Sequence, residues 1–202
     1  LLTLGAYYAG SDAYDQARAV LLRAYAAPPQ DRDALTTLLF RLGLVHQLGS
    51  RPDLNAAIDF YSQLLEQTPD HLLARYNRGL AFLARAQPGD WVLALGDFDG
   101  TIQRSPGFLP ARIGRGVTYL YRRAEGDDEA ALREFTYVIE RDDQRPMAYY
   151  NRGLLAIRRD MPGLWEGDLA RVVELAPDFA GGFSGLCWGY VLEGAVEKAI
   201  PA

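Results

Sequence analysis

The chain has 202 residues, 49% of them hydrophobic and 23% charged, a composition that supports a sizeable core and argues against a disordered chain. Its net charge of −5 has the wrong sign for a general binder of the nucleic-acid backbone. One cysteine excludes an internal disulfide framework, and two histidines argue against a histidine-built metal centre. No apolar run approaches the ~18 residues of a membrane span.

Taken in chain order, the sequence predicts pairs of amphipathic helices. Apolar residues recur at i, i+3, i+4 and i+7, a spacing typical of a helix with one buried face; one such run is Leu35, Leu38, Leu39, Leu42 and Val45. Prolines mark the expected ends of four second helices, because proline cannot continue a helix: Pro29, Pro69, Pro106 and Pro177. The expected pairs occupy residues 1–29, 30–69, 70–106, 107–143, 144–177 and 178–202, the last pair being incomplete.

Three segments, 74–80, 111–117 and 148–154, repeat one pattern. Each begins with alanine and carries an Arg-Gly pair four and five residues later, so that Gly79, Gly116 and Gly153 are 37 residues apart. Each segment leads into a second apolar stretch, in which two residues are spaced by four: Ala94 and Phe98, Ala131 and Phe135, Trp165 and Leu169.

This pattern resembles the tetratricopeptide repeat, a helix–turn–helix unit with the ordered pattern W-x2-L-G-x2-Y…A-x3-F…P. Six copies in register cover nearly the whole chain, from Leu1, Leu4, Gly5 and Tyr8 in the first to Phe183, Leu186, Cys187, Tyr190 and Ala199 in the last. The resemblance implies an all-α, right-handed solenoid of antiparallel helix pairs, with residues 1–202 as a single array. It also implies a non-enzymatic protein–protein interaction scaffold without a cofactor.

Extra residues fall in the turns inside three repeats. From the glycine position to the alanine position the distance is 12 residues in repeats one, five and six, but 14, 15 and 15 in repeats two, three and four. The inserted segments 49–53, 87–90 and 125–128 are rich in turn formers and helix caps. Insertions on one edge of a solenoid are places where such arrays differ in function.

Small residues are expected where the two helices of a pair cross. A glycine inside a helix costs roughly 1 kcal/mol relative to alanine, so its repetition indicates close packing. The small residues are Gly43, Gly79, Gly116, Gly153 and, in the last copy, Cys187. We therefore expect Cys187 to be a buried structural thiol.

Charges repeat as well. An arginine precedes the glycine in three repeats, and an acid precedes the Phe or Leu of the second helix. We predict that each arginine pairs with an acid of its own or a neighbouring repeat, which would form a structural ladder from Arg78, Arg115, Arg152, Asp97, Glu134 and Asp168. The alternative is a stripe of arginines that faces a ligand.

In the family that the sequence resembles, the first helices of the pairs line a concave surface on which ligand peptides usually lie. Transferring the repeat positions predicts a mostly aliphatic and aromatic groove: Arg41, Tyr76, Asn77, Leu80, Val117, Tyr121, Tyr150, Asn151, Leu154 and Trp188. Asparagine amides can bond a peptide backbone, and aromatic side chains can supply affinity. We expect a protein or peptide partner with an apolar face.

One subset of the family holds the C-terminal carboxylate of chaperones with a clamp of Lys, Arg and Asn. Asn77 stands at a clamp position, but the basic positions of the next repeat hold Pro110 and Gly114. Those after Asn151 hold Gly181 and Gly185. The sequence therefore disfavours a chaperone-tail adaptor.

No catalytic motif is found. Cys187 has no histidine nearby in the sequence, and His46 and His71 have no metal-binding spacing. We expect both histidines to be ordinary surface or half-buried residues.

The ends of the sequence predict a piece of a longer protein. Leu1 falls within a first helix, and the last repeat has few polar residues, although the terminal face of a solenoid needs a polar cap. Apolar terminal repeats would favour a homodimer. Two further roles stay open: a structural spacer or self-associating segment of a larger regulatory protein, and an enzyme part with its site in the long turns. We expect a cytoplasmic protein.

Overall fold

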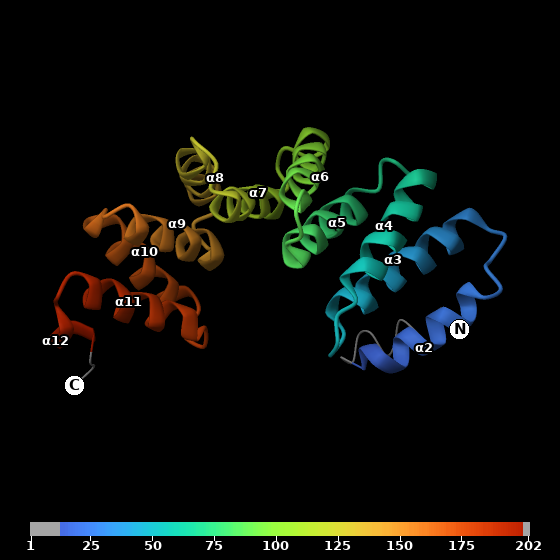
Figure 1. The fold of residues 1–202 in the computed structure, drawn as a ribbon, viewed down its shortest axis with the longest axis horizontal. Coiled ribbons are helices and arrows are strands. Elements are labelled where there is room, and N and C mark those ends of the chain that lie inside the picture. The colour runs from blue at the N-terminus through green and yellow to red at the C-terminus, as the bar shows by residue number, and fades with distance from the viewer. Residues whose placement is uncertain (1–12, 200–202) are drawn as a thin grey trace. The chain divides into compact units, whose positions relative to one another are not determined.

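The computed structural model describes residues 13–199, and every regular element in this range is a helix (Figure 1). Leu1, Leu4, Gly5 and Tyr8 of the first repeat lie outside the described residues. The helices are α2 (Tyr14–Tyr25), α3 (Arg32–Leu48), α4 (Leu54–Gln67), α5 (Leu72–Arg85), α6 (Asp90–Arg104), α7 (Leu109–Arg122), α8 (Asp127–Arg141), α9 (Pro146–Arg158), α10 (Pro162–Leu175), α11 (Ala180–Leu192) and α12 (Val196–Ala199). The prediction of an all-α chain is confirmed.

The helices divide into two compact units, the first ending at Phe108 and the second beginning at Leu109. Within the first unit α3 packs on α4 and α5 on α6; within the second, α7 packs on α8 and α9 on α10. Short turns join the members of each pair, which is the arrangement of antiparallel helices. The inserted segment 49–53 lies in such a turn, and the segments 87–90 and 125–128 begin in the turn and run into the start of α6 and α8.

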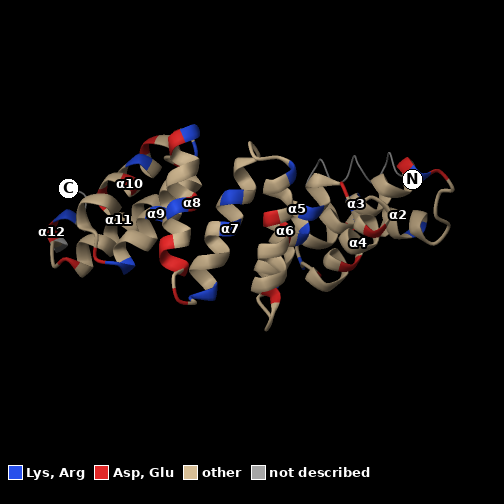
Figure 2. Ribbon diagram, turned by 90° about the horizontal axis from the view of Figure 1, so that it is seen from above, with Lys and Arg blue, Asp and Glu red and all other residues tan. Residues whose placement is uncertain are grey.

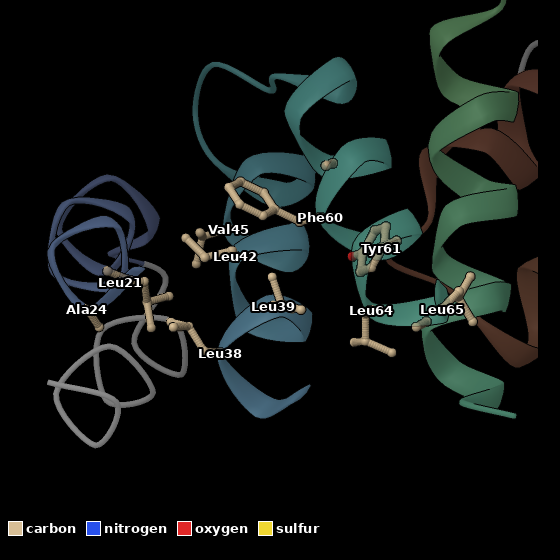
Figure 3. Close-up of a cluster of buried hydrophobic side chains, with 13 residues drawn as sticks. Leu21, Ala24, Leu38, Leu39, Leu42, Val45, Phe60, Tyr61, Leu64 and Leu65 are labelled. Atoms are coloured by element: carbon tan, nitrogen blue, oxygen red, sulfur yellow. The ribbon is translucent and has the colours of Figure 1, made fainter. Parts of the chain in front are cut away.

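The core of the first unit consists of aliphatic and aromatic side chains from α2, α3 and α4 that point toward one another (Figure 3). Leu21, Leu38 and Leu42 are fully buried, and each contributes roughly 2 kcal/mol by leaving water. Tyr61 is also fully buried, and its hydroxyl donates to Oε1 of Gln47 at 2.8 Å. The apolar spacing in the sequence therefore identifies the buried faces correctly.

The glycines lie at equivalent helix crossings. A Cβ added at Gly43 would lie 2.3 Å from the ring of Tyr61, and one added at Gly116 would lie 2.6 Å from the ring of Phe135. The other two repeats have the same arrangement, with Gly79 against Phe98 and Gly153 against Leu169. The predicted close packing is confirmed in repeats two to five.

The sixth repeat differs, and the prediction of a buried Cys187 is wrong: the thiol is exposed. The buried side of α11 carries a row of glycines instead. Cβ atoms at Gly185 and Gly189 would lie 3.0 Å from Leu169 and 2.4 Å from Trp165, so this face packs closely on α10. The second helix of this repeat, which was expected to cover Cys187, is α12 (Val196–Ala199), with four residues.

His46 is also not the surface or half-buried residue that the sequence predicts. It is 7% exposed, packs against the ring of Phe60, and both of its ring nitrogens lack a hydrogen-bond partner among the described residues. Burial therefore lowers the pKa of His46 below its ordinary value. His71 is half-buried as expected, with its pKa also lowered by burial, and its Nδ1 accepts from the backbone N–H of Ala74 at the start of α5.

These histidines predict an acid-sensitive stability. Below pH ~6.5 an unfolded histidine takes up a proton that the buried ring resists, so stability falls as the pH falls. We expect a loss of up to about 1 kcal/mol per pH unit per histidine between pH ~6.5 and ~5.5, above the range in which carboxylates titrate. Urea unfolding at several pH values measures it. His46→Leu/His71→Asn, which keeps a capping side chain at 71, should flatten the dependence; an unchanged slope would contradict this origin.

Candidate peptide-binding surface

The predicted arginine ladder is present within each unit. Nε and Nη2 of Arg78 donate to the two carboxylate oxygens of Asp97 at 2.8 and 2.7 Å, and Arg152 contacts Asp168 in the same way at 2.8 Å. Arg115 donates to Glu134 at 2.5 Å. Figure 2 shows the basic and acidic segments along the helices. The prediction is confirmed, and the arginine stripe that faces a ligand is not supported.

A second set of ion pairs was missed by the sequence reasoning. Arg85 binds Asp90 with two hydrogen bonds of 2.7 and 3.0 Å, and Arg122 binds Asp127 with two of 2.5 and 2.9 Å. The backbone N–H three residues before each aspartate donates to the same carboxylate. The arginine hydrogen bonds lower the pKa of both aspartates. The signal was available, because R-x-x-x-G-D occurs at 85–90 and 122–127.

Each of these pairs, which we call turn clamps, closes an inserted turn. The residue after the clamp arginine has a left-handed backbone, with φ of 53° at Ala86 and 54° at Arg123. This conformation is uncommon for residues other than glycine, so the surrounding contacts must hold it. The turn clamp thereby fixes the backbone position of Arg123, whose side chain is exposed.

The predicted groove residues of the first unit lie on α3 and α5, which contact each other. Arg41, Tyr76, Asn77 and Leu80 are all half-buried. Tyr76 packs edge-on against Phe108, with ring centroids 5.1 Å apart, and burial raises the pKa of its hydroxyl. Much of this aromatic ring therefore serves the packing of the unit.

The groove residues of the second unit lie on α7, α9 and α11, and α9 contacts both of the other helices. Val117 is half-buried, whereas Tyr121 and Trp188 are 63% and 58% exposed. Tyr150 packs edge-on against Phe179, with ring centroids 5.0 Å apart. The exposed aromatic rings are the ones that a ligand can reach.

The two asparagines use their amides inside the protein. Nδ2 of Asn77 donates to the carbonyl of Leu73, and Nδ2 of Asn151 donates to that of Met147, each at 2.7 Å. Asn151 is only 8% exposed. An amide N–H that we expected to face a peptide is therefore engaged within its own helix.

A hollow of about 170 Å³ brings three predicted residues together between α7 and α9. Its lining is Leu120, Tyr121, Arg123, Asn151, Leu154, Leu155 and Arg158. We call it the α7–α9 hollow. Arg123 and Arg158 also line a second hollow of about 360 Å³ beside the inserted turn, which we call the turn hollow; the remaining lining residues there are Ala124, Gly126, Asp128, Glu129 and Arg159.

Two features were sought in the part of the chain that the structure describes: clusters of metal ligands and helices able to span a membrane. Within residues 13–199, no three His, Cys, Asp or Glu side chains are grouped so that they could hold a metal ion. No described helix combines the length and apolar character that crossing a bilayer requires.

No protein-family profile matches the chain, and no curated protein sequence does. Solved structures, by contrast, are similar to it. A tetratricopeptide repeat protein from Parabacteroides merdae superposes with a TM-score of 0.77 at 21% identity, over 98% of this chain and 73% of that one. A thermophilic TPR protein of Thermus thermophilus gives 0.71 at 20% identity, over 94% and 97%. The chain has the tetratricopeptide repeat fold.

A third similar structure is YrrB, described as a TPR protein with an unusual peptide-binding site. It superposes with a TM-score of 0.61 at 18% identity, over 89% of this chain and 87% of YrrB. At these identities the similarity establishes the fold of this chain. Its function has to be argued from its own surface.

Proposed function

We propose that this TPR chain is a non-enzymatic protein-interaction scaffold, with its predicted repeats as one array, that binds a peptide or helix with an apolar face. The observation that carries the proposal is the α7–α9 hollow, whose lining includes the exposed ring of Tyr121, Leu154 and the buried Leu155. A concave site that combines apolar and aromatic side chains with a few polar ones, here Asn151, Arg123 and Arg158, has the composition of a ligand site. The peptide-binding site described for YrrB, which has the same fold, agrees with it.

The test starts from peptides selected on the intact chain. A displayed library of random dodecapeptides is enriched on the immobilised protein, and the selected peptides are synthesised and titrated by fluorescence anisotropy. Tyr121→Ala should weaken binding by about tenfold, because an aromatic anchor in such a pocket is worth about 1–2 kcal/mol. Leu93→Ala, which truncates a side chain that is 50% exposed on α6, is the matched control. Equal affinities for both variants would refute the location, and a library without enrichment would refute peptide binding.

Self-association through the last repeat is a second candidate. Four apolar side chains of α11 are at least half exposed: Phe183, Trp188, Val191 and Leu192. An apolar surface of this kind favours contact between copies. Sedimentation equilibrium distinguishes the candidates: a dimer that Trp188→Lys converts to monomer supports self-association, and a monomer at all concentrations excludes it.

A further inference from the structure

The α7–α9 hollow carries positive charge. Two of its seven lining residues are arginines, Arg123 and Arg158, and none is acidic. Arg158 is paired with Asp128, so the unpaired positive charge at the hollow comes from Arg123, in a chain whose net charge is −5. Charge of one sign beside an apolar depression favours a ligand with the opposite sign and an apolar part.

The two arginines differ in what they contact. Arg158 forms an ion pair with Asp128 and donates to the carbonyl of Leu120 at 3.4 Å. Arg123 has no side-chain hydrogen bond or ion pair with any described residue, although every arginine of the ladder and of the turn clamps has one. The guanidinium of Arg123 is therefore available to a partner, and that of Arg158 has donors left, because the group carries five N–H bonds.

The position of Arg123 follows from the fold. The turn clamp between Arg122 and Asp127 holds the inserted turn, and the left-handed backbone at Arg123 directs the chain away from α7 at that residue. The residue thus reaches the rim of both hollows, as does Arg158 at the end of α9. Two guanidinium groups on one rim suit a carboxylate, which can accept two hydrogen bonds at once.

We propose that the scaffold reads an aspartate or glutamate side chain of its bound peptide with Arg123 and Arg158, while a neighbouring apolar side chain of that peptide occupies the α7–α9 hollow. The inference rests on the proposed function and adds the chemistry of the partner. The turn hollow continues beyond the two arginines, so the peptide chain can extend past them. That geometry favours an acidic residue within a segment over a terminal carboxylate.

Asp128 competes for the same arginine. When the peptide carboxylate binds Arg158, it shares that guanidinium with Asp128, and the two acids repel each other. Removing the charge of Asp128 should therefore strengthen binding of an acidic peptide. Removing the charges of Arg123 and Arg158 should weaken binding of the same peptide. Damage to the fold would weaken binding in both cases, so it would not explain opposite effects.

The experiment uses the intact chain and the displayed library of random dodecapeptides. Selection on the unaltered protein should enrich Asp or Glu beside an apolar residue, and Arg123→Gln/Arg158→Gln should remove the acidic preference while the apolar one persists. For a synthetic selected peptide, the double variant should lower affinity by about tenfold, the effect of one or two charge-assisted hydrogen bonds. Asp128→Asn should raise it severalfold. The same peptide with its acid changed to the amide should respond to neither change.

Arg23→Gln/Arg133→Gln is the control of equal charge, because both of these arginines are exposed and lie outside the two hollows. An equal loss of affinity in this control would show a general charge effect and overturn the inference. Enrichment of apolar peptides without an acid would also overturn it, while leaving the proposed function standing. Enrichment only of peptides with a free C-terminal carboxylate would overturn the choice of an internal acid, and no enrichment at all would overturn both proposals.

Discussion

Replacing Asp168 by alanine should lower the free energy of unfolding by about 3 kcal/mol. The side chain of Asp168 is 5% exposed, and its partner Arg152 is 14% exposed, so the substitution leaves a nearly buried guanidinium without its acid. Removing one member of such a buried pair costs about 3–5 kcal/mol, because the remaining charge stays desolvated. Urea unfolding followed by circular dichroism measures the change.

The matched control is Glu174→Ala in the same helix. Glu174 pairs with Arg171 at 2.9 Å, but its side chain is 66% exposed, and pairs of this kind contribute at most about 1 kcal/mol. The double variant Arg152→Met/Asp168→Leu should recover part of the lost stability, because it removes both charges. Equal effects of Asp168→Ala and Glu174→Ala would show that the ladder does not stabilise the repeats.

Alanine at Gly116 and alanine at Gly167 should change stability in opposite directions. At Gly116 the new Cβ would lie 2.6 Å from the buried ring of Phe135, which has to move. We expect a net loss of about 1–2 kcal/mol, since overpacking costs more than the gain in helix propensity. At Gly167, within α10, no atom lies within 4 Å of the added Cβ. There we expect alanine to raise the free energy of unfolding by about 0.5–1 kcal/mol, because only the gain in helix propensity acts.

Thermal unfolding of the two single variants provides the comparison within one unit. A neutral or stabilising Gly116→Ala would mean that the helices of the pair can separate at little cost. The recurring glycines would then need a reason other than close approach, and the physical basis of the repeat assignment would be lost.

The fold could be predicted because its determinants are local and recur. In repeats two to five the glycine of one helix meets a large side chain of the next, aromatic in the first three of these repeats and Leu169 in the fourth. Positions that recur along the chain are therefore in contact in the structure. Cys187 shows where prediction from the repeat position fails. It occupies the repeat position, but three other glycines on α11 provide the surface that packs on the neighbouring helix, and a sequence does not say which of two such faces is covered.

The candidate site could be predicted only in part. The repeat positions put Tyr121, Asn151 and Leu154 on one surface, and the structure brings them to one hollow. Whether the amide of Asn151 points to a ligand or to its own helix depends on side-chain packing that the pattern does not contain. Arg123 was missed because it belongs to an inserted turn, and its position depends on a clamp between the end of α7 and the start of α8.

The ladder arginines also reach backward along the chain. Nη1 of Arg78 donates to Oγ of Ser62, so one guanidinium ties α5 to both α4 and α6; Arg152 does the same through Thr136, tying α9 to α8 and α10. Because one side chain bonds residues of two successive repeats, fraying of either repeat removes a hydrogen bond from the other. Neighbouring repeats within a unit should therefore open together rather than one by one, which raises the coupling between nearest neighbours in the array.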